Sequence, residues 1–176
     1  MPIRAVASPA ADTAIQRQVR ALAQAHAAQP GALLPLLHAV QDALGHVPPE
    51  GVPVIAEELN LSRAEVHGVV SYYHHFRSEA AGRVLLQVCQ AEACQARGAA
   101  ALAHEAERMV GCGMHATTAD ASVTLEPVYC LGLCASGPSV AVNGRPHARV
   151  TPQRLRDVLQ RALQVPATPA APGASA

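Results

Sequence analysis

Two tight pairs of cysteines constrain this chain more than any other feature of its sequence. Cys89 and Cys94 enclose four residues, Cys130 and Cys134 enclose three, and 35 residues separate the two pairs. Each pair follows a run rich in β-forming residues, at the point where the run gives way to small residues. If those runs are strands with adjacent ends, the four thiols meet at one edge of a single domain.

Two pairs of thiols can hold either zinc or an iron–sulfur cluster. Structural zinc sites often use short intervals of about two residues within a pair, and both intervals here are longer. A [2Fe–2S] cluster takes four cysteines, two on each iron, and longer intervals suit this larger group. The spacing therefore favours an iron–sulfur cluster, with zinc, disulfides and a chance arrangement as the alternatives.

Composition argues against several other classes of protein. The 176 residues include 13 arginines, no lysine and 13 acidic residues, so the formal net charge is zero. Without a basic cluster, binding to nucleic acid or to anionic lipid is not expected. The N-terminus has no signal-peptide pattern, and no stretch approaches the ~18 apolar residues of a membrane span. We therefore expect a cytoplasmic chain with reduced thiols and no membrane insertion.

The N-terminal half shows the apolar spacing that is typical of helices. Gly45 is expected to end the second helix, and Ser62 with Glu65 forms a capping box that starts the fourth. The predicted helices cover approximately residues 12–28, 33–44, 52–59 and 62–76. Together they predict a small helical bundle.

The C-terminal half changes to apolar runs that are typical of strands. An Asn143-Gly144 turn predicts a hairpin, and Thr151 and Pro152 start a last helix as its N-cap and first residue. Strands are expected at 84–88, 123–129, 139–142 and about 147–150, with helices at 95–110 and from 152 onward. This order predicts a small α/β domain with one helix on each side of a short mixed sheet.

The predicted fold class is therefore α+β, with a helical bundle ahead of an α/β domain. We expect the bundle at residues 12–78 and the α/β domain at residues 79–165. Residues 1–11 and 166–176 are rich in small residues and proline, and they are predicted to be disordered.

The residues around the cysteines resemble a known family. C-Q-A-E-A-C-Q-A-R-G-A and L-E-P-V-Y-C-L-G-L-C, followed by P-S-V-A-V-N-G, resemble the thioredoxin-like [2Fe–2S] ferredoxin subunits that accompany the flavin subunit of respiratory complex I and of its soluble relatives. The N-terminal half is similar through G-A-L-L-P-L-L-H-A-V-Q-D-A-L-G-H-V-P and L-S-R-A-E-V-H-G-V-V-S-Y-Y-H-H-F. The resemblance covers roughly residues 12–163.

Within this family, A-E-A-C-Q-A and S-Y-Y-H-H-F look most like the gamma subunit of NAD-dependent, molybdenum-containing formate dehydrogenase. The alternatives are the equivalent subunits of complex I and of NAD-reducing hydrogenase. The formate dehydrogenase branch implies that electrons from formate reach NAD through iron–sulfur centres and a flavin.

The resemblance implies a thioredoxin-like C-terminal domain whose four paired cysteines ligate one [2Fe–2S] cluster: Cys89, Cys94, Cys130 and Cys134. It also implies partner subunits. A flavin- and NAD-binding diaphorase subunit would carry FMN and NAD, and through it the chain would be linked to a molybdenum-containing catalytic subunit. Further iron–sulfur clusters and the molybdenum cofactor are expected on those partners.

No catalytic nucleophile, acid–base pair or glycine-rich phosphate loop is apparent in the sequence, so the chain is expected to be a non-catalytic electron-transfer subunit of an NAD-dependent oxidoreductase. Two other functions compete. A free-standing ferredoxin or thioredoxin-like redox enzyme would have no need of the N-terminal helices. An iron–sulfur-sensing transcription factor is indicated by residues 54–66, which look like a helix-turn-helix, but the second of those helices offers few side chains that read bases.

Other residues near the cysteines have plainer interpretations. Cys112 has no partner at ligand spacing and is expected to be a small buried residue. Gly132 and Gly137 are expected to let backbone N–H groups approach the cluster sulfurs. The Gly137-Pro138 peptide bond is expected to be trans, as most X–Pro bonds are.

Histidines and aromatic residues gather at the end of the helical half. Adjacent residues of a helix point to different faces, so His74 and His75 are expected to contact a subunit or solvent and not a metal. Tyr72, Tyr73 and Phe76 form either part of the bundle core or an exposed surface for a partner.

Overall fold

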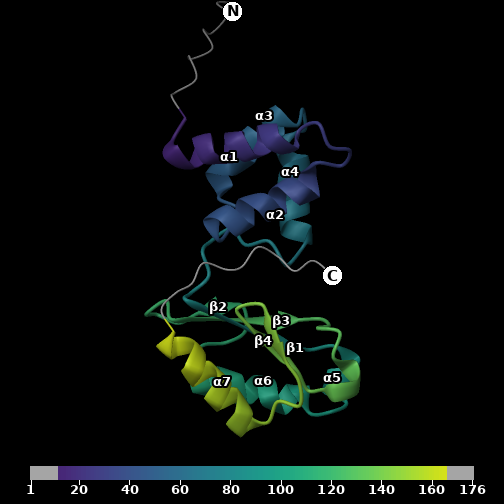
Figure 1. The fold of residues 1–176 in the computed structure, drawn as a ribbon, viewed down its shortest axis with the longest axis vertical. Helices are drawn as coiled ribbons and strands as arrows, with labels where there is room; N and C mark the ends of the chain where they lie inside the picture. Colours follow the sequence, from purple (N-terminus) through teal and green to yellow (C-terminus); the bar gives the residue numbers. More distant parts are fainter. Residues whose placement is uncertain (1–11, 166–176) are drawn as a thin grey trace, which may run out of the picture. The chain divides into compact units, whose positions relative to one another are not determined.

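The computed structural model describes residues 12–165, and the contacts within the chain divide between Glu79 and Ala80 into two units. Each unit has its own core of buried apolar side chains, and Figure 1 shows the helices of the first unit and the sheet and helices of the second. The sequence predicts two domains, at residues 12–78 and 79–165. That each of them folds independently stays a prediction. The disorder predicted for 1–11 and 166–176 lies outside the described residues. None of the helices within residues 12–165 is long and apolar enough to cross a membrane.

The first unit contains the four helices that the sequence predicts. Thr13 and Ser62 act as N-caps, and each forms a capping box with the third residue of its helix. Gly45 ends the second helix in the left-handed conformation. The helices are α1 (Ala14–His26), α2 (Leu33–Leu44), α3 (Val52–Glu58) and α4 (Arg63–Tyr72), and a short 3-10 helix, η1 (Pro49–Gly51), precedes α3.

One polar side chain, Gln41, lies within the otherwise apolar core of the first unit. Its exposed fraction is 5%. Its Nε2 donates to the backbone carbonyl of His75 at 2.8 Å, and its Oε1 accepts from the backbone N–H of Arg77 at 2.8 Å. Gln41 thereby fixes the path of the chain as it leaves the helical unit. The core around it consists of Val19, Ala23, Leu36, Leu37, Val40, Val47, Val54, Ile55, Ala56, Val66 and Phe76.

Helix α4 is shorter than predicted. It ends at Tyr72 instead of reaching Phe76, and Tyr73 has an extended ψ of 104°. The chain leaves the helix here because the buried amide of Gln41 holds the backbone that follows. Phe76 enters the core and packs edge-on against the ring of His38, with 5.0 Å between the ring centroids. Tyr72 stays 75% exposed, so the aromatic residues are divided between core and surface.

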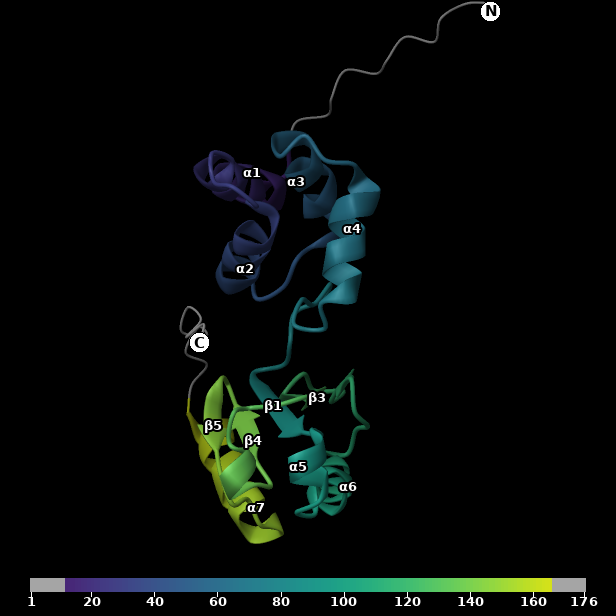
Figure 2. The ribbon, with the colours of Figure 1, turned by 90° about the vertical axis from the view of Figure 1, so that its right-hand side faces the viewer.

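The second unit is a five-stranded sheet in the order β2-β3-β1-β4-β5 (Figures 1 and 2). Strands β1 and β3 are parallel, and the other neighbours are antiparallel. The elements are β1 (Val84–Cys89), α5 (Glu92–Gln95), α6 (Ala99–Val110), β2 (Ala116–Thr117), β3 (Val123–Val128), η2 (Cys134–Ser136), β4 (Val140–Val142), β5 (Arg145–His147) and α7 (Pro152–Gln164). Helices ahead of a mixed sheet confirm the predicted α+β fold class.

Both long helices of the second unit cover the same face of the sheet, so the prediction of one helix on each side is wrong. Val84, Leu86 and Val88 alternate along β1 and therefore point to one face. All three belong to a single core with Leu102 of α6 and Leu155 of α7. The apolar side of β1 thus faces both helices, and the two views of the ribbon show α6 and α7 on that side (Figures 1 and 2).

Three local details of the second unit differ from the prediction. The helix predicted at 95–110 begins only at Ala99, and a separate short helix, α5, precedes it, because Gly98 takes a left-handed φ of 92° between the two. Strand β5 begins directly after the turn and not near residue 147, because Asn143 and Gly144 both have positive φ and form a tight two-residue turn. Strand β2 was not predicted, since two residues are too few to show a period.

Replacing Gln41 by leucine is expected to lower the free energy of unfolding by about 1–3 kcal/mol, because the backbone of His75 and Arg77 loses a buried partner. Urea unfolding followed by circular dichroism measures this change. Gln24→Leu, on the exposed side of α1, serves as the control and is expected to stay within about 0.5 kcal/mol. Equal stability of the two variants would contradict the role assigned to Gln41.

Candidate functional site

The parallel pairing of β1 with β3 brings the two cysteine segments to one end of the sheet. Cys89 is the last residue of β1 and lies opposite Val128, two residues before Cys130. The N–H of Gln90 donates to the carbonyl of Val128 at 2.7 Å, and the N–H of Cys89 donates to the carbonyl of Ser139 at 3.0 Å. The strand ends are therefore adjacent, which is the condition under which the sequence places both cysteine pairs at one edge of the domain.

The first pair, Cys89 and Cys94, is buried. Each side chain is 1% exposed, and Ala91, Ala99, Val128 and Leu131 pack around the two. The sulfur of Cys94 lies 3.5 Å from the hydroxyl of Ser139, which is itself buried. Burial opposes ionisation of Cys94, but hydrogen bonds from Ser139 and Cys89 and the charge of Arg97 together lower the pKa of its thiol.

The second pair, Cys130 and Cys134, is exposed, and its two sulfurs lie 3.6 Å apart. Gly132 has a φ of 72°, which turns its N–H toward the sulfur of Cys130 at 3.3 Å. This contact agrees with the approach of a backbone N–H to a sulfur that the sequence predicts at Gly132. The neighbouring Cys130, by its hydrogen bond and its charge, raises the pKa of Cys134, and burial and the charges of Cys94 and Cys89 add to this effect.

Gly137 and Arg97 connect the two cysteine segments. Arg97, three residues after Cys94, donates from its Nε to the carbonyl of Gly137 at 2.9 Å. A Cβ atom on Gly137 would lie 3.1 Å from the sulfur of Cys94, so the close approach requires glycine here. The predicted approach of backbone N–H groups to cluster sulfurs at Gly137 stays a prediction. The Gly137-Pro138 bond is cis, so the predicted trans bond is wrong.

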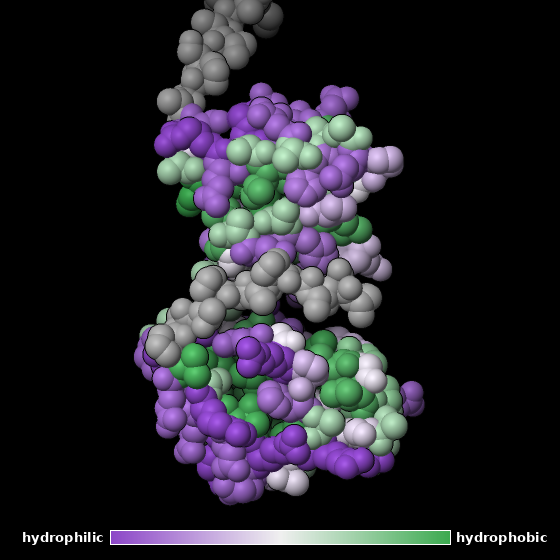
Figure 3. Space-filling model, in the orientation of Figure 1, coloured by the Kyte–Doolittle hydropathy of each residue, from purple (hydrophilic) through white to green (hydrophobic). Residues whose placement is uncertain are grey.

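The four thiols are thus arranged as two pairs from two loops. Within residues 12–165, no group of three or more His, Cys, Asp and Glu side chains is placed to hold one metal ion. A binuclear cluster instead requires two thiolates for each iron, and the two pairs match this donor set. Figure 3 shows an apolar area on the second unit over the end that carries α5. The residues around the thiols therefore fit a [2Fe–2S] cluster in donor type and number.

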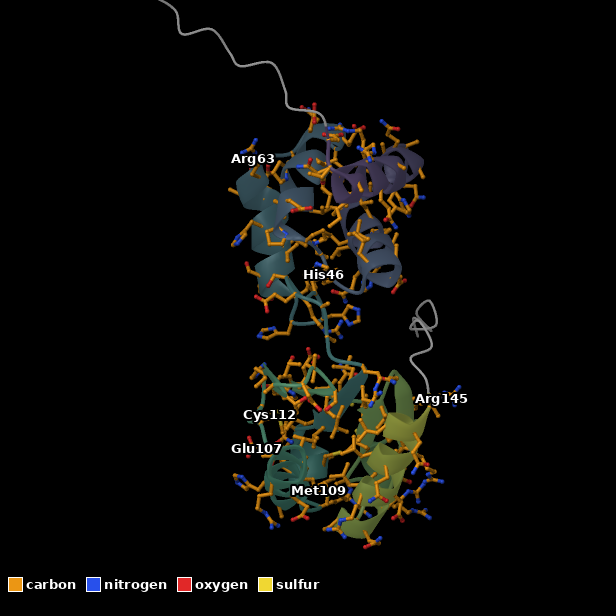
Figure 4. All side chains as sticks on the ribbon, turned by 90° about the vertical axis from the view of Figure 1, so that its left-hand side faces the viewer. His46, Arg63, Glu107, Met109, Cys112 and Arg145 are labelled. Carbon is orange, nitrogen blue, oxygen red and sulfur yellow. The ribbon has the colours of Figure 1, made fainter. Side chains whose placement is uncertain are left out.

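Cys112 lies away from the paired cysteines, at the other end of α6. Helix α6 begins at Ala99, beside the buried pair, and its 12 residues span about 18 Å. The thiol of Cys112 is half-buried, donates to the carbonyl of Ala116, and lies near Glu107 (Figure 4). Burial, and to a lesser degree the charge of Glu107, raise the pKa of Cys112.

The aromatic and histidine residues at the end of α4 belong to the first unit. His74 and His75 are exposed, and the ring of His75 lies 5.0 Å from the ring of His38.

The sequence profile of the thioredoxin-like [2Fe–2S] ferredoxin family matches residues 19–163. The chain belongs to this family. The match covers both units, so the helices ahead of the sheet are part of the shared sequence pattern.

Relatives of this family member belong to larger oxidoreductases. The chain is 32% identical over 124 residues to an NADH-quinone oxidoreductase subunit of Pseudomonas aeruginosa, covering 70% of this chain and 75% of the relative. It is 30% identical over 129 residues to the NADP-reducing hydrogenase subunit HndA of Solidesulfovibrio fructosivorans, covering 73% of this chain and 75% of the relative.

A solved structure has the same fold. A chain of NAD⁺-reducing [NiFe]-hydrogenase in the H₂-reduced state matches with a TM-score of 0.63 and 23% identity. The match covers 74% of this chain and 22% of the hydrogenase chain, so the fold is embedded there in a much longer polypeptide.

Sequence reasoning missed the residues that support the thiols. Ser139 comes close to Cys94 only through the pairing of β1 with β4, and Arg97 reaches Gly137 only when the two loops are assembled. Gln90, in contrast, directly follows Cys89 in the sequence. For Gln90, the sequence offers one signal of a supporting role, which is a polar residue directly after a cysteine. Nothing in the sequence distinguishes Arg97 from the other arginines.

Alkylation of the cluster-free chain with iodoacetamide is expected to modify Cys130 and Cys134 first. The buried Cys89 and Cys94 should react at least about tenfold more slowly than the exposed pair. They react only after a local opening of the fold, and an opening that costs ~1.4 kcal/mol already reduces the reactive population tenfold. Peptide mass spectrometry of timed samples gives the rates. Modification of all four thiols at one rate would contradict the unequal exposure of the pairs.

Proposed function

We propose that Cys89, Cys94, Cys130 and Cys134 hold one [2Fe–2S] cluster and that the chain is an electron-transfer subunit. The observation that carries this proposal is the meeting of two thiol pairs, from two loops, at one end of the sheet. Membership of a [2Fe–2S] family supports the cofactor. The relatives named above, which are subunits of NADH- and NADP-linked enzymes, support an electron-transfer role without a catalytic site on this chain.

The protein's own residues prepare the thiols for a cluster. Binding requires thiolates, and the lowered pKa of Cys94 favours release of its proton even though the side chain is buried. The N–H of Gly132 is already directed at the sulfur of Cys130. When bound, the cluster supplies one-electron oxidation and reduction.

The exposed pair marks the side from which a redox partner can approach. Cys130 and Cys134 are exposed, and Tyr129, directly before them, is 66% exposed. Aromatic and apolar side chains are enriched where proteins contact each other. We infer that this surface faces the flavin-binding partner subunit.

We propose that the parent complex is a soluble, cytoplasmic, NAD-dependent formate dehydrogenase. The support is the likeness of A-E-A-C-Q-A and S-Y-Y-H-H-F to the gamma subunit of that enzyme. The partners would be a diaphorase subunit with FMN and NAD and, through it, a molybdenum-containing subunit with further iron–sulfur clusters. The second candidate is the equivalent subunit of complex I or of a hydrogenase, which the names of the relatives favour.

Electron paramagnetic resonance of the purified chain tests the cluster. We expect no signal as isolated, one rhombic S = 1/2 signal after dithionite, and two irons for each chain, as a [2Fe–2S] centre requires. Cys130→Ser should abolish normal assembly of the cluster, and the matched control Cys112→Ser should not. Zinc in place of iron, or a full signal from Cys130→Ser, would overturn the ligand assignment.

Purification of the affinity-tagged chain from its native cell tests the parent complex. For the proposed enzyme, the co-purified material should contain a flavin subunit and molybdenum, and it should reduce NAD with formate. Reduction of NAD with hydrogen, or oxidation of NADH by quinone without formate activity, would assign the chain to one of the other two complexes.

A further inference from the structure

One buried side-chain atom among the described residues lacks a hydrogen-bond partner, and it lies beside the candidate ligands. This atom is Nε2 of Gln90, the residue that follows Cys89. An unpaired buried donor costs about 1–3 kcal/mol. Such atoms are rare in native proteins, and an absent ligand is one of their causes.

The backbone of Gln90 lies between the two cysteine segments. Its N–H donates to the carbonyl of Val128 at 2.7 Å, which joins the end of β1 to the end of β3 just before Cys130. Cys89 immediately precedes it, and Cys94 lies four residues further along the same loop. Gln90 is therefore flanked along the chain by Cys89 and Cys94, and its backbone is bonded to the residue two positions before Cys130.

The side chain of Gln90 is fixed at one of its two polar atoms. Its Oε1 accepts from Nε2 of Gln95 at 2.8 Å, and Gln95 is the residue that follows Cys94. The two glutamines thus span the loop of the buried thiol pair. Because Oε1 of Gln90 is bonded to Gln95, the NH₂ group of the same amide is directed away from Gln95. Solvent does not reach this NH₂ group.

An acceptor that suits this position is an anionic sulfur. Both the sulfides of a [2Fe–2S] cluster and the thiolates of its ligands accept hydrogen bonds, and bonds to charged acceptors are stronger than those between neutral groups. Since Nε2 of Gln90 reaches no cysteine sulfur, we propose that the side-chain amide of Gln90 donates a hydrogen bond to a sulfide of the bound cluster, and that this bond raises the reduction potential. This inference rests on the proposed function.

The direction of the effect follows from charge. Reduction adds one negative charge to the cluster, so a hydrogen-bond donor stabilises the reduced form more than the oxidised form. Hydrogen bonds to the sulfurs are one of the properties that set the potential of iron–sulfur proteins. Gln90 is in this sense a positioning and tuning residue, and it is not one of the ligands.

Redox titration of the cluster-loaded full chain, followed by electron paramagnetic resonance, tests the inference. Gln90→Leu, which keeps the bulk of the side chain and removes the donor, should make reduction roughly tenfold less favourable, a downward shift of ~59 mV for a one-electron couple. Gln87→Leu, the same change three residues earlier in β1, is the matched control and should keep the wild-type potential.

A wild-type potential in loaded Gln90→Leu would overturn the inference, whereas a wild-type chain without a [2Fe–2S] signal would overturn the proposed function instead. If Gln90→Leu does not load, Gln90→Met carries the same measurement. If neither variant loads, thermal unfolding of the cluster-free chains decides. Gln95→Leu, which removes only the bond between Gln95 and Oε1 of Gln90, is the reference for this comparison. A Tm of Gln90→Leu at or above that of Gln95→Leu supports an unpaired NH₂ donor, and a lower Tm shows that the NH₂ group has a partner within the protein and overturns the inference.

Discussion

The parallel pairing of β1 with β3 is the constraint on which the rest of the site depends. Parallel strands end at the same edge of a sheet, so residues that follow them meet even when they are far apart in sequence. A parallel pair also needs a long crossover, and here α5 and α6 provide most of it. The wide separation of the two cysteine pairs is therefore a requirement of the fold, and an antiparallel hairpin of the same strands would place the pairs at opposite edges.

The parts of the fold that depend on local chemistry could be predicted from the sequence. The capping box at Ser62, the left-handed Gly45 at the end of α2 and the N-cap at Thr151 are each encoded within a few residues. The apolar run before each cysteine pair predicts a strand ending there, but not that the two strands are neighbours in the sheet.

The remaining features depend on contacts between distant residues. Helix α4 ends early because the buried side-chain amide of Gln41, in α2, binds the backbone that follows α4. Nothing in the sequence of α4 or of its flanking residues indicates this contact. Both helices lie on the face of the sheet where Val84, Leu86 and Val88 of β1 are fully buried, whereas Leu85 and Gln87 on the other face are only partly buried. A short apolar run in the sequence does not reveal this difference. At the site, the cysteines were identified from their spacing, but the contacts of Ser139 with Cys94 and of Arg97 with Gly137 arise only when the loops are assembled.

The unequal exposure of the two thiol pairs also limits how the protein can mature. Cys89 and Cys94 are enclosed by packed side chains, and the close approach of Gly137 leaves no room on that side. A scaffold protein that delivers a preformed cluster can contact only Cys130 and Cys134 without opening the fold. On the proposed ligand assignment, cluster transfer would therefore begin at the exposed pair and end at the buried pair.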